Sequence, residues 1–163
     1  MTIFANTNKK VVRINGPPAR LFAILKRPEH WPVWDFDLKN VTLKDKAAAE
    51  RNLEGATGHL TMTNGNTFEF TIRNVIENQQ VEYLTKLPGG TDADWYWKFS
   101  PVDETAQAVD LEMGVRITGS TSFLWNLMFA PFLPKAFDVI GKNLKSLAEE
   151  GKVGGKDVSA LYE

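Results

Sequence analysis

Carboxylates are the first side chains to weigh for chemistry in this sequence. Asp35 and Asp37 are two residues apart, as are Asp92 and Asp94, so each pair would share a face in a strand. Paired carboxylates do acid–base work only at a set separation in space, which spacing along the chain does not fix. Carboxylates in loops are usually solvated. Of these four, Asp94 beside Trp95 at the start of a predicted strand is the best placed to line an opening.

The histidines give little support for a metal site. There are two, His30 and His59, and there is no Cys to complete a zinc site. His59 alternates with Leu60 and Met62, which predicts a position on the polar face of a strand. We therefore predict no metal site and no cofactor, and the sequence identifies no catalytic residue.

Composition narrows the class of protein. The 163 residues are 43% apolar and 24% charged with a net charge of −1, typical of one globular domain and without the basic excess of a nucleic-acid-binding protein. The absence of Cys favours a reducing cytoplasm, and residues 1–10 show no signal peptide. The longest apolar run, 122–133, is about half the length of a membrane span and predicts a buried helix. The oligomeric state stays open.

The elements that must position any site begin with a strand at residues 9–14. Gly16-Pro17-Pro18 ends this strand and starts a short helix, since proline is tolerated in a first helical turn. The tight segment 28–34 follows, and its two prolines leave little room for regular helix.

Strands dominate the middle of the chain. Asn64-Gly65 predicts a hairpin between strands 58–63 and 67–72, and the charged, Ala-rich residues 44–53 predict a loop or a ragged edge. Residues 109–118 show the cleanest alternation of apolar and polar side chains. Further strands are predicted at 80–87 and 95–99.

One long amphipathic helix is predicted at residues 134–150, ended by Gly151. Pro131 and Pro134 predict a kink or a split before it, fixed or moving as a gate. A sheet with one apolar face needs a cover, and only this helix is long enough. The predicted class is therefore α+β, with one domain over residues 1–151 and a flexible tail over 152–163.

These features resemble a known superfamily. The order of elements, the Trp31-Pro32-Val33-Trp34 segment, and the close from Val115-Arg116-Ile117-Thr118-Gly119 into Leu144-Lys145-Ser146-Leu147-Ala148-Glu149 resemble the START-like (SRPBCC) superfamily, and within it the polyketide cyclase/dehydrase-like group. The resemblance implies a helix-grip fold, in which a curved antiparallel sheet wraps around a C-terminal helix. It also implies a cavity that binds a lipid, sterol, polyketide, quinone or similar compound. The group has no universal catalytic motif, so no catalytic residue follows from it.

Candidate ligand-binding residues are those expected where the sheet faces the helix. They are Trp34, Met62, Phe70, Tyr83, Trp97, Met113, Phe123, Leu127 and Met128. Each of them alone is also explained by plain core packing. Trp31 and Trp34 either form the rim of a pocket or fasten their segment to the sheet, and the Tyr83 hydroxyl either orients a ligand or bonds the backbone.

Three functions remain open. The preferred one is a carrier or sensor that binds a hydrophobic small molecule in an internal cavity. The alternative is a polyketide cyclase or dehydratase, which requires polar groups converging inside the pocket. The second alternative is a protein-interaction module, which an exposed patch at Phe129 and Phe132 would favour. No transmembrane segment is expected, and transient membrane contact is compatible with all three.

Overall fold

The computed structural model describes residues 7–163, so most of the segment expected to lack a signal peptide, residues 1–6, lies outside the described residues. Side chains at 7, 48, 49 and 51 are not described either. The strands are β1 (Thr7–Asn15), β2 (Leu38–Leu43), β3 (Thr57–Met62), β4 (Thr67–Ile76), β5 (Gln80–Leu87), β6 (Thr91–Pro101), β7 (Ala108–Gly119), β8 (Lys152–Val153) and β9 (Lys156–Asp157). The helices are α1 (Pro18–Leu25), η1 (Pro28–Val33), α2 (Lys46–Asn52), α3 (Ser122–Phe129), α4 (Leu133–Glu150) and η2 (Ser159–Tyr162).

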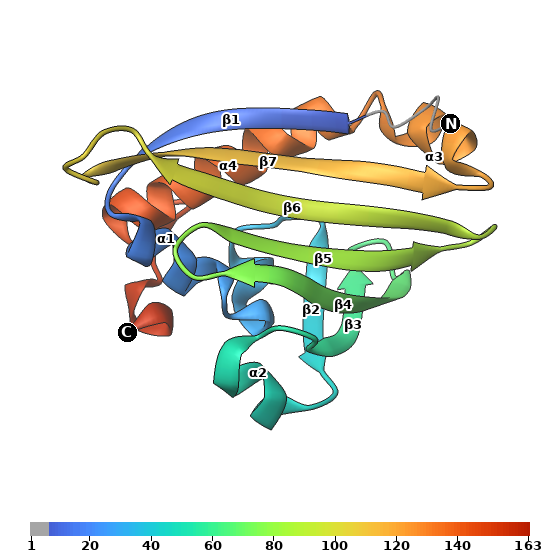
Figure 1. Ribbon diagram of the computed structural model, residues 1–163, viewed down its shortest axis with the longest axis horizontal. Helices are drawn as coiled ribbons and strands as arrows, with labels where there is room; N and C mark the ends of the chain where they lie inside the picture. Colours follow the sequence, from blue (N-terminus) through green and yellow to red (C-terminus); the bar gives the residue numbers. More distant parts are fainter. Residues whose placement is uncertain (1–6) are drawn as a thin grey trace.

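A seven-stranded antiparallel sheet forms most of the molecule, in the order β1-β7-β6-β5-β4-β3-β2 (Figure 1). Only β1 is out of sequence order: it pairs with β7 along its whole length, from Thr7 opposite Arg116 to Asn15 opposite Ala108. In the register of β6 and β7, Trp97 lies opposite Met113, so both side chains point to the same face. The predicted alternation over residues 109–118 is confirmed, since Val109, Leu111 and Ile117 are fully buried.

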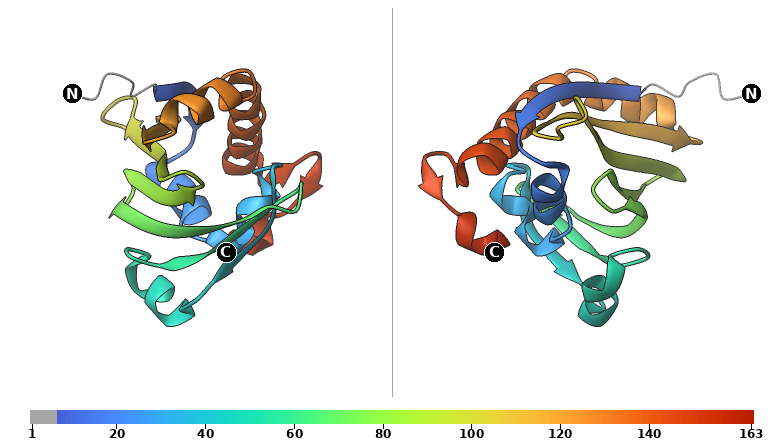
Figure 2. Two further views of the ribbon diagram at one scale, coloured as in Figure 1. Left: turned by 90° about the vertical axis from the view of Figure 1, so that its right-hand side faces the viewer. Right: turned by 60° about the vertical axis from the view of Figure 1, so that its left-hand side comes forward.

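Helix α4 covers the concave face of this sheet (Figure 2). Phe137, Ile140 and Leu144 lie on its buried stripe. The helix approaches the sheet closely at Gly141, where a Cβ atom would lie 2.8 Å from Val12 Cγ2 and 3.1 Å from Met113 Cε. The curved sheet around the long C-terminal helix is the predicted helix-grip fold.

The helical region is split where the two prolines predict a break. Helix α3 ends at Phe129, α4 begins at Leu133, and the two are bent by 64°. At the other end Gly151 caps α4 with φ 69°, in the left-handed region that glycine adopts without strain. Within residues 7–163 no single helix has the length and apolar character to cross a membrane; only α3 and α4 taken together would, across their bend.

Two segments differ from the sequence expectation. Residues 46–52, expected as part of a loop or a ragged edge, form helix α2, because alanine has the highest helix propensity of any residue. Residues 152–163, expected as a flexible tail, form the β8–β9 hairpin and η2. Arg27 donates to the carbonyl of Leu161, and the Tyr162 ring lies edge-on to His30 at 5.8 Å. These contacts draw the end of the chain back onto α1 and η1.

We predict that Gly141→Leu destabilises the protein by about 2 kcal/mol, because the added side chain forces α4 away from β1 and β7. Urea unfolding measures this change. Lys142→Leu is the matched control, since Lys142 is exposed on the same helix and should shift the midpoint little. Equal effects of the two substitutions would contradict the close approach at Gly141.

Candidate functional site

An aromatic cluster fills the centre of the concave face. The Trp31 ring stacks on Tyr83 at 5.0 Å and lies 5.9 Å from Phe70 and 5.7 Å from Trp97. Trp34 meets Trp97 edge-on at 5.6 Å. Both Trp31 and Trp34 are 0% exposed, so the idea that they form a half-wet rim is wrong, and they fasten η1 to the sheet instead.

Six of the predicted ligand-binding side chains lie on the concave face: Trp34, Met62, Phe70, Tyr83, Trp97 and Met113. The expectation that the other three face the sheet is wrong: Phe123, Leu127 and Met128 are 62%, 65% and 48% exposed. The physical reason is the 64° bend, which takes α3 out of line with the buried stripe of α4.

In helix α3 the usual distribution of side chains is reversed, with apolar side chains exposed and a polar one buried. Its buried residue is Asn126, at 7% exposure, in a helix whose large apolar side chains Phe123, Leu124, Leu127 and Met128 face solvent. Both amide atoms of Asn126, Nδ2 and Oδ1, are buried and have no hydrogen-bond partner within the described part of the chain. A buried polar group without a partner costs stability, so this amide calls for an explanation beyond folding.

Further polar groups without full partners lie in the aromatic cluster. The indole Nε1 of Trp34 is buried and unpartnered among the described residues, whereas that of Trp31 donates to the Leu25 carbonyl at 2.8 Å. The Tyr83 hydroxyl has no hydrogen bond to any described residue. Burial, and secondarily the charge of Asp35, raise its pKa well above the usual value.

Asp35 is the buried acid of the site. Its side chain accepts one hydrogen bond, from the backbone N–H of Asp37 at 3.2 Å. Burial raises the pKa of Asp35 to about 7, and the hydrogen bond from Asp37 only partly opposes this. The concave face therefore carries a carboxyl group that gains and loses its proton near neutral pH, close enough to Tyr83 to influence it.

Several apolar and aromatic side chains packed against the buried core are themselves partly exposed. Trp95 stacks on Tyr83 at 6.2 Å and its Nε1 donates to the Thr85 hydroxyl at 3.2 Å, yet Trp95 is partly exposed. Trp125 and Phe129, whose rings lie 5.5 Å apart on α3, are also partly exposed, as are Met62 and Phe68. We call this set the open end of the grip: Met62, Phe68, Trp95, Trp125 and Phe129.

Two cavities of the described part of the chain lie at the margins of the fold. One, of about 650 Å³, opens between α1, η1, α2 and the ends of β2 and β4; it has an apolar floor that includes Phe22, Leu43 and Leu53 and a rim of mixed charge. A second, of about 220 Å³, lies between β1 and the start of α4. Neither is at the centre of the concave face, because Trp31 and Trp34 occupy that space. The internal cavity expected between the sheet and the long helix is thus not found at this place in the described part of the chain.

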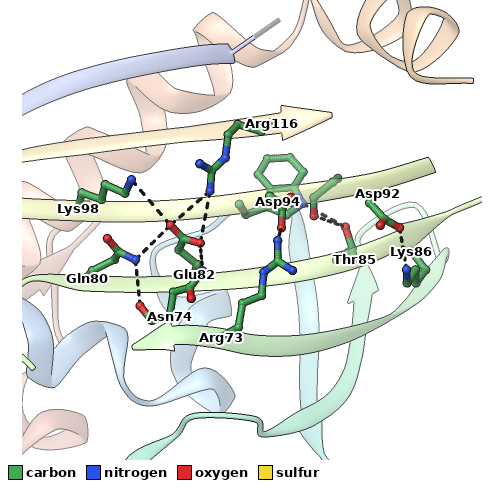
Figure 3. Close-up of polar contacts among 12 residues, drawn as sticks. Arg73, Asn74, Gln80, Glu82, Thr85, Lys86, Asp92, Asp94, Lys98 and Arg116 are labelled. Atoms are coloured by element: carbon green, nitrogen blue, oxygen red, sulfur yellow. Dashed lines mark hydrogen bonds and ion pairs between the residues drawn. The ribbon is translucent and has the colours of Figure 1, made fainter. Parts of the chain in front are cut away.

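The convex face of the sheet carries a charged ladder (Figure 3). Asp94 pairs there with Arg73, and Asp92 pairs with Lys86 at 2.9 Å. Burial raises the pKa of Asp94, which the charge of Arg73 opposes. Asp94 was expected to line an opening of the site, but its place in the alternation of β6 puts it on the convex face, on the opposite side of the strand from Trp95.

Glu82 is the buried member of this ladder, at 2% exposure. Asn74 donates to it at 2.7 Å and Gln80 at 3.1 Å, and Arg116 lies 3.3 Å from the same carboxylate (Figure 3). A buried charge with this many partners is explained by the sheet itself.

No group of three or more His, Asp or Glu side chains within the described residues is arranged to hold a metal ion. The His59 side chain is 40% exposed and lies 3.5 Å from Glu69 on the convex face, as its place in the alternation predicts.

Sequence reasoning named Asp35 but expected it to be a solvated loop carboxylate, and it missed Asn126 altogether. For Asp35 the available signal was its position next to Trp34 in a segment that two prolines make rigid, since a rigid aromatic segment carries its neighbours inward. For Asn126 the signal was a lone amide in the apolar run 122–133. In such a helix the polar residue is the exceptional one.

Comparisons with known proteins show which family the chain belongs to. Residues 7–150 match the family described as "Polyketide cyclase / dehydrase and lipid transport". A search of curated proteins gives no match.

Several solved structures share the fold. The di-domain ARO/CYC StfQ from the steffimycin biosynthetic pathway is 16% identical, with a TM-score of 0.70 over 88% of this chain and 50% of that one, so this chain spans about half of StfQ. The Zhui aromatase/cyclase from Streptomyces sp. R1128 is 10% identical, with a TM-score of 0.68 over 93% and 99%. A START superfamily protein from Mycobacterium smegmatis is 13% identical, with a TM-score of 0.59 over 85% and 98%. At these identities the likeness establishes the fold alone.

We predict that Asp35 makes stability depend on pH. Its pKa in the folded state, about 7, exceeds the unfolded value of roughly 4, so the folded state holds the extra proton between these values. The free energy of unfolding should therefore fall as pH rises from about 4 to 7, by on the order of 4 kcal/mol, and level off above that.

Asp35→Asn should flatten this slope, measured by chemical denaturation across a pH series. Asp92→Asn removes a carboxylate of the convex face that is paired with Lys86, and it should leave the slope as in the wild type. A slope in Asp35→Asn that parallels the wild-type slope would show that Asp35 does not titrate in the fold.

Proposed function

Because the chain belongs to the polyketide cyclase/dehydrase and lipid transport family of the START-like superfamily, we propose that it binds a hydrophobic small molecule on the concave face of its sheet. The molecule enters at the open end of the grip. Its apolar body packs against the aromatic side chains there, which include Trp95, Trp125 and Phe129.

One observation carries this proposal: the Asn126 amide is buried with neither polar atom paired in the described protein. Folding alone would favour a leucine here, since an apolar side chain of similar size has no hydrogen bond to lose. A ligand that supplies a hydrogen-bond acceptor and a donor would satisfy the amide.

The class of ligand follows from this pairing of surfaces. A mostly apolar molecule with a few oxygen atoms fits, because aromatic walls bind its body and isolated polar groups fix its orientation. Polyketides and quinones carry carbonyl and hydroxyl oxygens on an apolar frame, and lipids carry them at one end. A fully charged ligand fits less well, because the side chains of the open end, Met62, Phe68, Trp95, Trp125 and Phe129, offer it no cationic partner.

Asp35 favours a second candidate function, an enzyme of the cyclase or dehydratase class. An acid–base residue works best with a pKa near the working pH, and burial raises the pKa of Asp35 to about 7. Cyclisation and dehydration of a polyketide both need a proton removed next to a carbonyl, and a carboxylate in an apolar pocket can accept it. Turnover of a polyketide precursor that is lost in Asp35→Asn and kept in Asp94→Asn would establish this activity.

We predict that Asn126→Leu separates stability from binding. The substitution removes a buried amide without partners, so it should raise the free energy of unfolding by about 1–3 kcal/mol. If the amide contacts the ligand, the same change should weaken binding about tenfold or more. Thermal unfolding gives the first quantity, and native mass spectrometry of protein purified from cells gives the second as the fraction that carries a small molecule.

Asn143→Leu is the matched control for stability, because the Asn143 amide does have a partner, the Trp34 carbonyl at 3.0 Å. It should lower stability where Asn126→Leu raises it. Wild-type protein that is purified empty, and that takes up nothing from a panel of lipids, quinones and polyketides, would contradict the proposed function.

A further inference from the structure

The outer side of α3 is an exposed apolar surface, separate from the polar atoms on its buried side. It consists of Phe123, Leu124, Leu127 and Met128, together with Phe132 at the bend, with exposures of 48% to 68%. We call these five residues the apolar tip. A soluble monomer gains nothing from exposing them, and large exposed apolar patches mark a contact surface.

The chain segment that carries the apolar tip is uncharged, and the two charged residues that flank the neighbouring β5–β6 turn, Lys86 and Asp92, pair with each other at 2.9 Å. The chain has no Asp, Glu, Lys or Arg between Arg116 and Lys135. The neighbouring turn between β5 and β6, Pro88-Gly89-Gly90, is also uncharged, and the Trp125 Nε1 donates to the Pro88 carbonyl at 3.1 Å. Helix and turn therefore form one uncharged end of the molecule, beside the ends of β6 and β7 and remote from the C-terminus (Figure 1).

We propose that the apolar tip inserts into the surface of a lipid bilayer, with α3 lying in the plane of the interface. Its 8 residues give a length of about 12 Å, too short to span the roughly 30 Å of a hydrocarbon core. An apolar helix face of this kind buries itself at the boundary between headgroups and acyl chains.

The size and character of the patch favour a bilayer over another protein. Five side chains at about half to two-thirds exposure present on the order of 500 Å², while a stable protein interface buries roughly 800 Å² on each partner. Protein interfaces also carry a polar rim, and here the adjoining turn and the bend contribute no charged group. A bilayer needs neither feature, because it accepts any apolar surface without matching its shape.

The different roles of the two sides of α3 suggest what the membrane contact does. This inference rests on the proposed function. The apolar tip faces outward, while Asn126 is buried on the other side and Trp125 and Phe129 belong to the open end of the grip. Docking by the tip would bring the open end against the acyl region. A hydrophobic ligand could then pass between bilayer and protein without crossing water.

Flotation with extruded phosphatidylcholine vesicles tests the contact. Wild-type protein should float with the vesicles, and Leu127→Asp should reduce the bound fraction about tenfold, because a carboxylate placed in the interface must be desolvated. Ile76→Asp is the matched control: Ile76 is 47% exposed on β4, away from the tip, and the same change there should leave flotation as in the wild type. Thermal unfolding confirms that both variants are folded.

The kind of contact is tested with salt and lipid charge. Apolar insertion predicts binding to neutral vesicles that high salt does not remove, so binding only to phosphatidylserine vesicles, lost at high salt, would overturn the proposal. Wild-type protein that fails to float, or an oligomer in vesicle-free solution that Leu127→Asp dissociates, would overturn it too. The latter result would assign the tip to a second copy of the chain.

Failure of the proposed function is distinguishable from failure of this contact. Asn126→Leu should lose the bound small molecule and still float with vesicles. Leu127→Asp should stay off the vesicles and keep its small molecule when that is supplied in detergent solution. Loss of flotation in Asn126→Leu would contradict the assignment of separate roles to the two sides of α3.

Discussion

The packing of Trp31 against the centre of the sheet is the interaction on which the inner architecture depends. Its ring contacts Tyr83, Phe70 and Trp97, and its indole N–H donates to the Leu25 carbonyl, so it fixes η1 to the sheet and to the end of α1 at once. Pro28 and Pro32 restrict the backbone on either side of it. Once Trp31 is in place, the few residues that follow have little freedom, and Asp35 is carried inside with its carboxyl group short of partners.

Helix α3 departs from the rule that governs the rest of the fold. In α4 and β7 the apolar side chains are buried and the polar ones exposed, whereas α3 exposes Leu127 and buries Asn126. Natural sequences are locally consistent with their folds, and exceptions gather at functional sites. Rotating α3 about its axis would bury the leucine and hydrate the amide, so the fold forgoes a gain that the contacts within the described protein do not repay.

The sequence predicts secondary structure and burial best where a regular spacing of apolar residues assigns them all to one face of a strand or helix. The alternation over residues 109–118 gives β7, Asn64-Gly65 gives the turn between β3 and β4, and Pro131 and Pro134 give the break between α3 and α4. The candidate site was harder, because local pattern does not encode how a helix rotates after a bend. Five of the nine predicted side chains lie on the concave face since strand period fixes them, and Trp34 reaches it from the end of η1. The other three are exposed since the 64° bend does not preserve helical phase. Asp35 lies in a segment without any period, so its burial follows from the tertiary contacts of its neighbours.

The contrast between Glu82 and Asn126 shows how this fold divides structure from function. Both are polar side chains less than a tenth exposed. Glu82 is surrounded by Asn74, Gln80 and Arg116, so the protein itself accounts for its burial. Asn126 has no such partners, and the cost of that state persists only if something outside the described chain offsets it. On this physical ground the conspicuous charges of the convex face belong to the scaffold, and the unpaired amide of α3 is the feature from which we propose a ligand site.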